Sequence, residues 1–392
     1  MPLSETRCEQ CGQAALSFAY VPERSTRGLK VFVCGHCGLV QSLPRIDRTG
    51  LREAMAVSSG ADWGNVRYGK GFRTGAAMAA LTAHADLARP LCVLDVGSNR
   101  GRFATALLEA APQVRLTAVE PDERFAQSCA GLPRTKLVHA RIEDVWLDDA
   151  SFDIVHSCHT VEHLAHPLAV LKDHARVLKP GGLLVIDAPN IALTASDDVV
   201  EEWFIDKHLY HFSHATLSRM LHAAGFAIVA HPDPDDAANL LFVARKAGAV
   251  PGGAADPVEA ALAMARIARY RKTRAANLAA LAQAARAIEA LYPRRVALWG
   301  AGRLFDSLVL AGFDPRGLAL LIDAHLAPLT DTRHGVRLAM PDALTHTPVD
   351  TVIVMSRAFA QEIAREAIHR APGAEILLYA DLLARARQAE AA

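Results

Sequence analysis

Short apolar runs alternate with longer amphipathic stretches along the middle of the chain. The runs have the length and composition of buried strands, and the stretches between them are long enough for helices. Strands are predicted at residues 92–97, 115–120, 136–140, 152–158, 181–189 and 239–246. This alternation predicts βαβ units, and hence an α/β fold with a mostly parallel sheet and helices on both faces.

A second α/β pattern follows nearer the end of the chain. Its apolar runs begin at Arg295, Leu318, Thr351 and Ala374, after a Gly- and Pro-rich break and an Ala/Arg-rich stretch that predicts one or two helices. These differences in composition and apolar pattern divide the chain into four segments. They are a small cysteine-bearing module (1–48), a Rossmann-like domain (49–247), a linker and helical connector (248–292) and a second Rossmann-like domain (293–392).

Composition and charge restrict the class of protein. Of the 392 residues, 51% are hydrophobic and 21% are charged, which provides enough apolar material for buried cores and excludes wholesale disorder. The 42 basic residues balance the 42 acidic ones, so no net field attracts a nucleic-acid backbone. No apolar run is long enough to cross a bilayer, and the first residues do not resemble a secretory signal. We therefore expect a cytoplasmic enzyme without a membrane or nucleic-acid partner.

Four cysteines form two closely spaced pairs near the start of the chain. Cys8 and Cys11 make one C-x-x-C pair, and Cys34 and Cys37 make the other. Each pair can present two thiolates from one tight turn, and two such pairs make a tetrahedral sulfur site of the kind that structural zinc prefers. A rubredoxin-like iron site is the chemical alternative. The spacing predicts a structural zinc module.

A glycine-rich turn follows the first predicted strand of the central domain. Asp95, Gly97 and Gly101 form a D-x-G-x-x-x-G pattern, and the next predicted strand ends at Glu120. Glycines let the backbone approach a ligand closely, and an acidic residue at Glu120 can accept hydrogen bonds from both ribose hydroxyls. The spacing differs from the G-x-G-x-x-G loop that suits a pyrophosphate, which disfavours the alternative of an NAD-binding redox domain.

Together with residues 141–145 and the Thr-Val-Glu-His segment 160–163, this loop resembles class I methyltransferases that use S-adenosylmethionine. The resemblance implies that the loop lies under the methionine portion, that Glu120 binds the ribose, and that Ile142 and Glu143 border the adenine. The cofactor-binding residues that it implies are Asp95, Gly97, Ser98, Asn99, Gly101, Glu120, Ile142, Glu143 and His159.

Further motifs narrow this resemblance. The segment 34–44 (CGHCGLVQSLP), the loop 97–101 (GSNRG) and segments 298–303, 334–342 and 355–363 are similar, in this order, to the zinc-containing sugar C-methyltransferases. That family implies a nucleotide-linked keto-deoxysugar as the acceptor and a carboxy-terminal domain that holds its nucleotide part. For that domain, a purely structural role and NAD binding are the alternatives, although Phe305 replaces the third glycine of an NAD fingerprint.

A histidine in a Glu-His-x-x-Tyr-Phe-Ser segment is the proposed base of that family. Here His208 occupies its place, Lys207 replaces the acidic neighbour, and Ile205 stands where a tyrosine is expected. Tyr210 is a further catalytic candidate. His163 is a second candidate base, because a neutral imidazole can accept a proton near neutral pH.

Two alternatives to carbon methylation follow from the same residues. One is O-methylation of a sugar, a polysaccharide unit or a natural product, for which an imidazole base also serves. The other is a protein that binds the cofactor and recruits a partner without catalysing transfer. The sequence does not fix the acceptor, the methylated atom or the oligomeric state.

Overall fold

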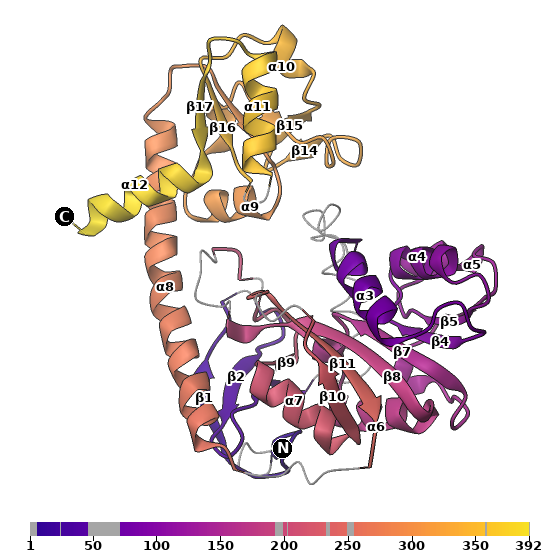
Figure 1. Cartoon of the computed structure of the whole chain (residues 1–392). Helices are drawn as coiled ribbons and strands as arrows, with labels where there is room; N and C mark the ends of the chain where they lie inside the picture. Colours follow the sequence, from indigo (N-terminus) through magenta and orange to yellow (C-terminus); the bar gives the residue numbers. More distant parts are fainter. Residues whose placement is uncertain are drawn as a thin grey trace. The chain divides into compact units, whose positions relative to one another are not determined.

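The computed structural model describes residues 6–23, 25–45, 71–192, 199–201, 203–232, 236–248, 255–356 and 359–391 (Figure 1). The start of the predicted central domain (49–70) and part of the predicted linker (249–254) lie outside these residues. Contacts divide the chain into two compact units. The first contains the described residues from 6 to 192 and from 203 to 268, and the second contains 199–201 and those from 269 onward.

A seven-stranded sheet forms the centre of the first unit. Its order is β10-β11-β8-β7-β4-β5-β6, and the last five strands in this order are parallel, with β11 antiparallel to β8 and β10 antiparallel to β11. The strands are β4 (Cys92–Val96), β5 (Arg115–Val119), β6 (Thr135–Val138), β7 (Phe152–Cys158), β8 (Leu178–Pro189), β10 (Phe226–Ala230) and β11 (Asn239–Lys246). The predicted α/β fold with a mostly parallel sheet is confirmed, although the sequence pattern missed β10.

Helices cover both faces of this sheet, as predicted. They are α3 (Gly71–His84), α4 (Arg102–Ala110), α5 (Glu123–Ala130), α6 (Pro167–Val177) and α7 (His214–Ala223). Alternate residues of each strand point to opposite faces. Val93 therefore packs with Leu81 of α3 and Leu107 of α4, whereas the next residue, Leu94, lies in the core that holds Leu171 of α6 and further side chains from α7.

The cysteine-bearing segment folds as a small antiparallel sheet against this domain. Its strands are β1 (Leu16–Tyr20), β2 (Lys30–Cys34) and β3 (Val40–Leu43), and a fourth strand, β9 (Tyr210–His211), comes from the segment between β8 and α7. In the pairing of β3 with β9, Val40 lies opposite His211 and Gln41 opposite Tyr210. The cysteine module and the segment that carries the candidate base therefore share one sheet.

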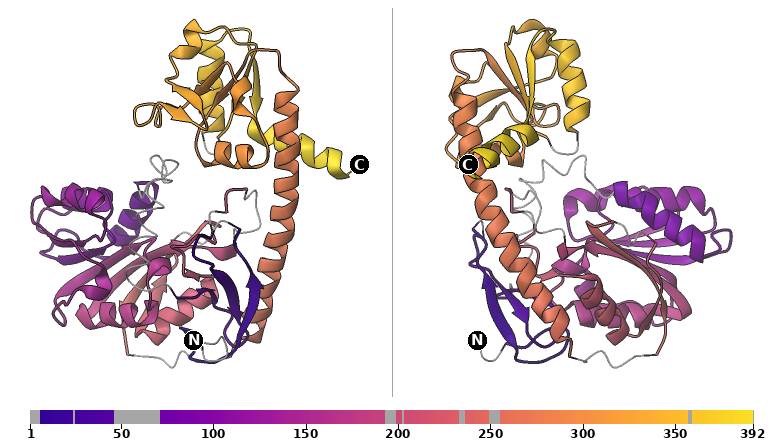
Figure 2. Two further views of the ribbon diagram at one scale, coloured as in Figure 1. Left: turned by 180° about the vertical axis from the view of Figure 1, so that it is seen from behind. Right: turned by 60° about the vertical axis from the view of Figure 1, so that its left-hand side comes forward.

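A long helix, α8 (Pro257–Glu289), extends from the first unit into the second (Figures 1 and 2). The sequence predicted one or two helices here, and the structure has one. Its first turns pack on the cysteine module: a Cβ added to Gly38 would lie 2.6 Å from Cγ of Glu259. Only glycine fits at this approach, and Gly38 also has a positive φ of 78°.

The second unit is built on a six-stranded sheet of order β14-β15-β13-β12-β16-β17, of which only β14 is antiparallel to its neighbour. The strands are β12 (Val296–Trp299), β13 (Leu320–Ile322), β14 (Thr332–Arg333), β15 (Val336–Ala339), β16 (Thr351–Val354) and β17 (Glu375–Leu378). The helices after α8 are α9 (Arg303–Leu310), α10 (Ala343–His346), α11 (Ala360–Arg370) and α12 (Tyr379–Ala391).

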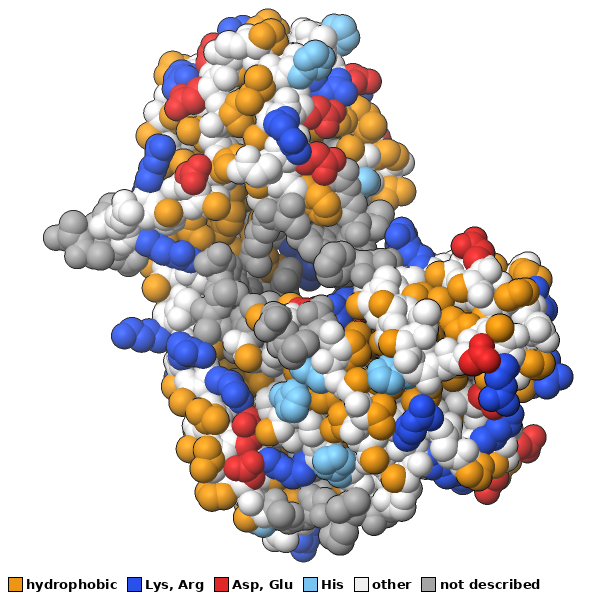
Figure 3. Space-filling model, in the orientation of Figure 1, with side chains coloured by type: hydrophobic (Ala, Val, Ile, Leu, Met, Phe, Trp, Pro, Cys, Tyr) orange, Lys and Arg blue, Asp and Glu red, His pale blue; other side chains and the backbone are white. Residues whose placement is uncertain are grey.

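The surface agrees with the balanced charge of the sequence. Lysine and arginine side chains are interspersed with aspartate and glutamate over the face drawn in Figure 3. Among the described residues, no helix is long and apolar enough to cross a membrane.

Candidate cofactor and acceptor site

A small open pocket lies where β4 and β7 end. The chain leaves β4 toward β5 on one side and later returns to β7 on the other side, so this is a topological switch point of the sheet. Ligands of open α/β sheets bind outside the carboxyl ends of strands at such points. Four of the predicted cofactor residues line the pocket: Asp95, Gly97, Ser98 and Asn99.

The turn after β4 has the geometry that the glycine pattern predicted. Gly97 and Gly101 have φ values of 72° and 70°. A Cβ at Gly97 would lie 2.3 Å from Oγ1 of Thr160, and a Cβ at Gly101 would lie 3.1 Å from Sγ of Cys129. Side chains are therefore excluded at both positions by conformation and by space.

Glu120 holds the same turn from the neighbouring strand. Its Oε2 accepts a hydrogen bond from the amide of Asn99 at 2.6 Å, and its Oε1 accepts one from the amide of Asp122 at 3.0 Å. The side chain is buried. The turn amides therefore orient a carboxylate, a group that can accept about four hydrogen bonds.

A buried ionic network borders the pocket, and sequence analysis missed most of it. Asp95 Oδ1 lies 2.7 Å from Nδ1 of His156, whose ring stacks on Phe103 at 3.6 Å between centroids. Arg73 donates to Asp187 and to Asp236, each at 2.5 Å. Asp95 and Arg73 line the same pocket although they are distant in sequence. The sequence pattern around Arg73 and His156 gave no sign that these two residues would lie at the site.

Three polar atoms of these residues have no hydrogen-bond partner among the described residues: the acceptors Oδ2 of Asp95 and Oδ1 of Asp187, and the donor Nη2 of Arg73. Of these three side chains, those of Asp95 and Arg73 line the pocket. A buried polar atom without a partner costs free energy, so such atoms indicate where a ligand bonds. One acceptor and one donor are what the ammonium and carboxylate of an amino acid require. The pocket therefore fits the methionine end of S-adenosylmethionine.

The remaining predicted cofactor residues lie outside the pocket lining. Ile142 and Glu143 lie on a 3₁₀ turn (Ile142–Asp144), where Glu143 Oε1 accepts from Arg141 and from the amide of Ala165, both at 3.0 Å. His159 has a φ of 47°, and its Nε2 lies 2.8 Å from Oδ1 of Asn239. None of these three contributes to the pocket lining.

Two histidines meet at the same edge of the sheet. His163 ends a 3₁₀ turn (Val161–His163) after β7, His208 precedes β9, and their ring centroids are 4.9 Å apart. Nδ1 of His163 lies 2.8 Å from the carbonyl of Lys207, and Nδ1 of His208 lies 2.9 Å from the carbonyl of Trp203. A carbonyl only accepts, so each Nδ1 carries a hydrogen, and in the neutral form of either ring the lone pair is then on Nε2.

The surroundings of His208 favour the neutral imidazole. Burial, followed by the neighbouring His163 and Lys207, lowers the pKa of His208 well below its usual value. A neutral ring with a free Nε2 can accept a proton. The structure thus places both predicted bases together, with the tautomer that a base needs.

Tyr210 has a different environment from the histidines. Its side chain is buried, and its hydroxyl donates a hydrogen bond to the carbonyl of Ala165 at 2.9 Å. Burial raises its pKa, so the phenol stays protonated. Its contacts are those of a packing residue that anchors β9, and the structure does not bring it into the histidine pair.

The four cysteines converge as the spacing predicted. Their sulfur atoms lie within 4.8 Å of one another, with Cys8 and Cys37 at 3.6 Å and Cys11 and Cys34 at 3.6 Å. A tetrahedral ion with metal–sulfur bonds of about 2.3 Å separates its ligands by about 3.8 Å. The described residues therefore fit a tetrahedral thiolate site.

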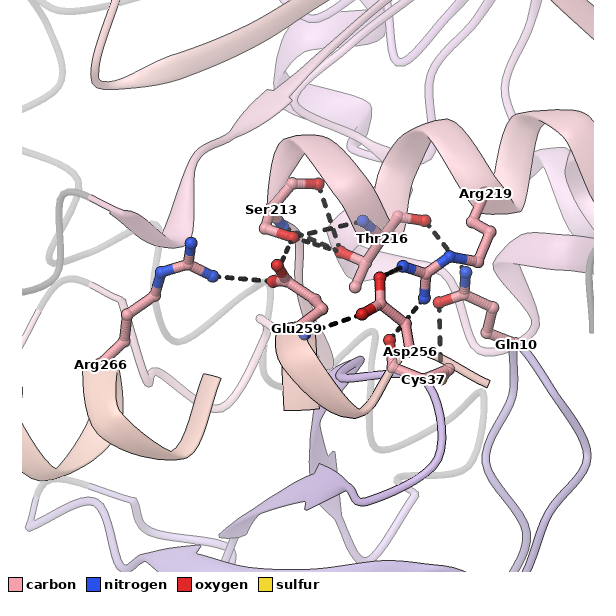
Figure 4. Close-up of polar contacts among 8 residues, drawn as sticks. All are labelled: Gln10, Cys37, Ser213, Thr216, Arg219, Asp256, Glu259 and Arg266. Carbon is pink, nitrogen blue, oxygen red and sulfur yellow. Dashed lines mark hydrogen bonds and ion pairs between the residues drawn. The ribbon is translucent and has the colours of Figure 1, made fainter. Parts of the chain in front are cut away.

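Polar contacts join this cysteine site to α7 and α8 (Figure 4). Arg219 of α7 donates to the carbonyl of Cys37 at 2.6 Å and pairs with Asp256 at the start of α8. Ser213, which caps α7, donates to Oε1 of Glu259 at 2.7 Å. Because α7 follows β9 directly, these contacts also fix the end of the segment that carries His208.

The second sheet has the same combination of a glycine turn after one strand and an acidic residue after the next. Gly300 follows β12 with a φ of 117°, and a Cβ there would lie 2.5 Å from the carbonyl of Met355. Asp323 after β13 accepts from the amide of Ala301 at 3.0 Å, much as Glu120 accepts from Asn99. Its other oxygen accepts from two amides of its own turn, those of His325 and Leu326.

A parallel sheet with a glycine turn, an acidic residue on the next strand and a pocket at the switch point defines an α/β domain of the nucleoside-binding class. Comparison with known proteins finds a family that matches part of the chain. Residues 70–231 match the family described as "Methyltransferase domain". This part of the chain is similar to S-adenosylmethionine-dependent methyltransferases.

Curated relatives match part of the chain. The chain is 30% identical over 138 residues to a probable S-adenosylmethionine-dependent methyltransferase of Mycolicibacterium smegmatis. This alignment covers 35% of the present chain and 52% of that protein. The chain is 37% identical over 123 residues to a dimethylglycine N-methyltransferase of Parasynechococcus marenigrum, covering 28% and 44% respectively. The chain spans about half the length of the curated relatives it matches.

A solved structure is also similar over part of the chain. It is the 1,6-didemethyltoxoflavin-N1-methyltransferase of Burkholderia thailandensis, with a TM-score of 0.41 and 21% identity, covering 59% of this chain and 99% of that one.

Proposed function

We propose that this chain transfers a methyl group from S-adenosylmethionine to carbon of a nucleotide-linked keto-deoxysugar, with His208 as the general base. The observation that carries the proposal is the histidine pair. Two imidazoles that each donate Nδ1–H to a backbone carbonyl lie at the strand edge where the cofactor turn lies. An acceptor bound there has a base beside it and the cofactor pocket on the same edge.

The chain's own residues account for the steps on the acceptor side. When bound, the cofactor supplies an electrophilic methyl group on its sulfonium. Nε2 of His208 takes the proton from the carbon beside the ketone, and the electron pair of the broken C–H bond forms the new bond to the methyl carbon. The cofactor would keep the electron pair of its S–CH₃ bond and so become S-adenosylhomocysteine. The turn at Gly97, with Asp95, Arg73 and Glu120, holds the cofactor so that the two carbons meet in line.

The choice of a sugar acceptor rests on the resemblance of the cysteine module, the 97–101 turn and the histidine segment to the sugar C-methyltransferases. The shared sheet supports it: β9 joins the cysteine module just after His208. We propose that Cys8, Cys11, Cys34 and Cys37 bind one structural zinc ion. We further propose that the domain from residue 293 onward holds the nucleotide part of the acceptor without a redox cofactor.

O-methylation is the second candidate, and Lys207 favours it. The family that methylates carbon has an acidic residue at this position and a tyrosine at the place of Ile205. A cation lowers the pKa of His208, which weakens it as a base for a carbon acid. An O-methyltransferase depends less on a strong base, because proton removal can accompany methyl transfer.

Product analysis tests the proposal. The purified chain is incubated with S-adenosylmethionine labelled in the methyl group and a panel of nucleotide-linked keto- and hydroxysugars, and the products are mapped by mass spectrometry and NMR. We expect label on a carbon adjacent to the ketone. Label on oxygen would select the second candidate, and no product across the panel would refute the sugar acceptor.

A further inference from the structure

Glu162 lies beside the two candidate bases, and the three side chains form a cluster of metal-ligand type. We propose that Glu162, His163 and His208 bind a divalent transition-metal ion, separate from the thiolate site, and that the bound ion inhibits methyl transfer. The binding claim is independent of the proposed function. The inhibition claim rests on it, because the ion would occupy the lone pairs that the base uses.

The backbone fixes the two segments that supply these ligands. The amide of His163 donates to the carbonyl of Thr160 at 3.0 Å, and the amide of His208 donates to that of Ile205 at 2.9 Å. A third hydrogen bond, from the amide of Leu209 to the carbonyl of Glu162 at 2.8 Å, connects the segments directly. The ligands therefore sit on a backbone that is ordered before any ion binds.

The rings are oriented as metal-binding histidines are. Such histidines donate their second ring N–H to a backbone carbonyl or a carboxylate, which selects the tautomer and holds the ring. Both rings here donate Nδ1–H to a carbonyl, one to Lys207 and the other to Trp203. In this tautomer the nitrogen that can bind an ion is Nε2 of each ring.

The distances permit coordination after a small movement. One ligand atom from each residue lies within 4.8 Å of the others, and Nε2 of His163 is 3.6 Å from Oε1 of Glu162. Two ligands at about 2.0–2.1 Å from a tetrahedral ion are about 3.3 Å apart. Glu162 is 2% exposed, so an ion would neutralise a carboxylate that is largely removed from water.

The donor set indicates the class of ion. Two imidazole nitrogens and one carboxylate oxygen suit zinc, cobalt, nickel or copper, whereas magnesium and calcium prefer oxygen ligands throughout. Three protein ligands leave a position open for water or an acceptor oxygen. The four-cysteine site differs from this cluster in its ligand atoms, which are all sulfur, and in its coordination, because four ligands leave no open position.

Binding of cobalt to the full chain, with its thiolate site already loaded with zinc, tests the proposal. We expect about one further equivalent of Co²⁺ with visible d–d absorption and no sulfur-to-metal charge-transfer band. Glu162→Gln and His163→Asn should each weaken this binding at least about tenfold. His166→Asn is the matched control, since His166 is an exposed histidine of the same segment and should bind cobalt as the wild type does.

Two results would overturn the site: no second equivalent of cobalt, or binding that Glu162→Gln and His163→Asn leave unchanged. Calorimetry with Zn²⁺ repeats the measurement without relying on colour. Circular dichroism of each variant separates loss of a ligand from loss of fold.

An activity measurement separates this inference from the proposed function. If the ion binds and His208 is the base, added cobalt should inhibit methyl transfer over the range in which the d–d band appears, and a chelator that spares the thiolate site should restore it. Binding without inhibition would leave the site established and contradict His208 as the base. Inhibition of equal strength in Glu162→Gln, which keeps the histidines but loses the site, would overturn the link between site and inhibition.

Discussion

The amide of Asn99 donates a hydrogen bond of 2.6 Å to the carboxylate of Glu120, from one strand end to the next. Asn99 can make this bond because the turn after Gly97 places it at a positive φ of 48°. The turn and the acidic residue therefore form one unit. In the proposed cofactor site, this unit would present the carboxylate of Glu120 to the ribose.

Replacing Glu120 with alanine should weaken binding of S-adenosylmethionine at least tenfold. The substitution removes an acceptor for the ribose hydroxyls, and a hydrogen bond to a charged group contributes about 1.5–3 kcal/mol. Isothermal titration calorimetry measures the change. Glu123→Ala is the control, because Glu123 is exposed on α5 and should retain wild-type affinity. Unchanged affinity in Glu120→Ala would contradict the assignment of the ribose site.

Replacing Arg73 with lysine should weaken binding of S-adenosylhomocysteine by about tenfold or more, and leave 5′-methylthioadenosine unaffected. Lysine keeps the positive charge beside Asp187 but lacks the Nη2 donor that we assign to the amino-acid carboxylate. Methylthioadenosine lacks that carboxylate and serves as the matched ligand. An equal loss for both ligands would mean that Arg73 supports the pocket as a whole and does not bind the carboxylate.

The purified chain should contain about one zinc ion, held by Cys8, Cys11, Cys34 and Cys37. Metal analysis after expression in zinc-supplemented medium measures it. Cys11→Ser should reduce the metal content, whereas Cys92→Ser, outside the cluster, should not. A content near zero, with all four thiols open to titration, would refute the zinc site.

Ser213→Ala should destabilise the first unit by about 1–2 kcal/mol. The hydroxyl caps α7 by accepting from the amide of Thr216, and it also donates to the buried Glu259 of α8. The shift of the urea unfolding midpoint of the full chain measures the effect. Ser17→Ala, at an exposed position of β1, is the control. A midpoint equal to that of the control would show that the capping contact contributes nothing to stability.

The sequence predicted those features that depend on local pattern. The strands 152–158 and 239–246 are found at the predicted residues, because each has an apolar centre that is buried in the sheet. The turn at Gly97 was predictable since its conformation requires glycine. By contrast, β10 (Phe226–Ala230) follows α7 so closely that its five residues gave no separate signal.

The features that escaped prediction depend on contacts between distant parts of the chain. Strand β9 has only two residues and exists because β3 pairs with it. Arg73 lies 114 residues before its partner Asp187, and no spacing rule connects them. The histidine pair was predicted in part. His163 and His208 were separate candidates in the sequence, and only the structure showed that their rings lie side by side.

Single-turnover rates of methyl transfer test the central claim, that His208 is the base. With saturating S-adenosylmethionine and the acceptor found by product mapping, His208→Asn should transfer its methyl group about 10²–10⁴ times more slowly than the wild type while binding the cofactor normally. His163→Asn should lose less, because His163 neighbours the base without replacing it. A normal rate in His208→Asn together with a slow rate in His163→Asn would contradict the account and assign the base to His163.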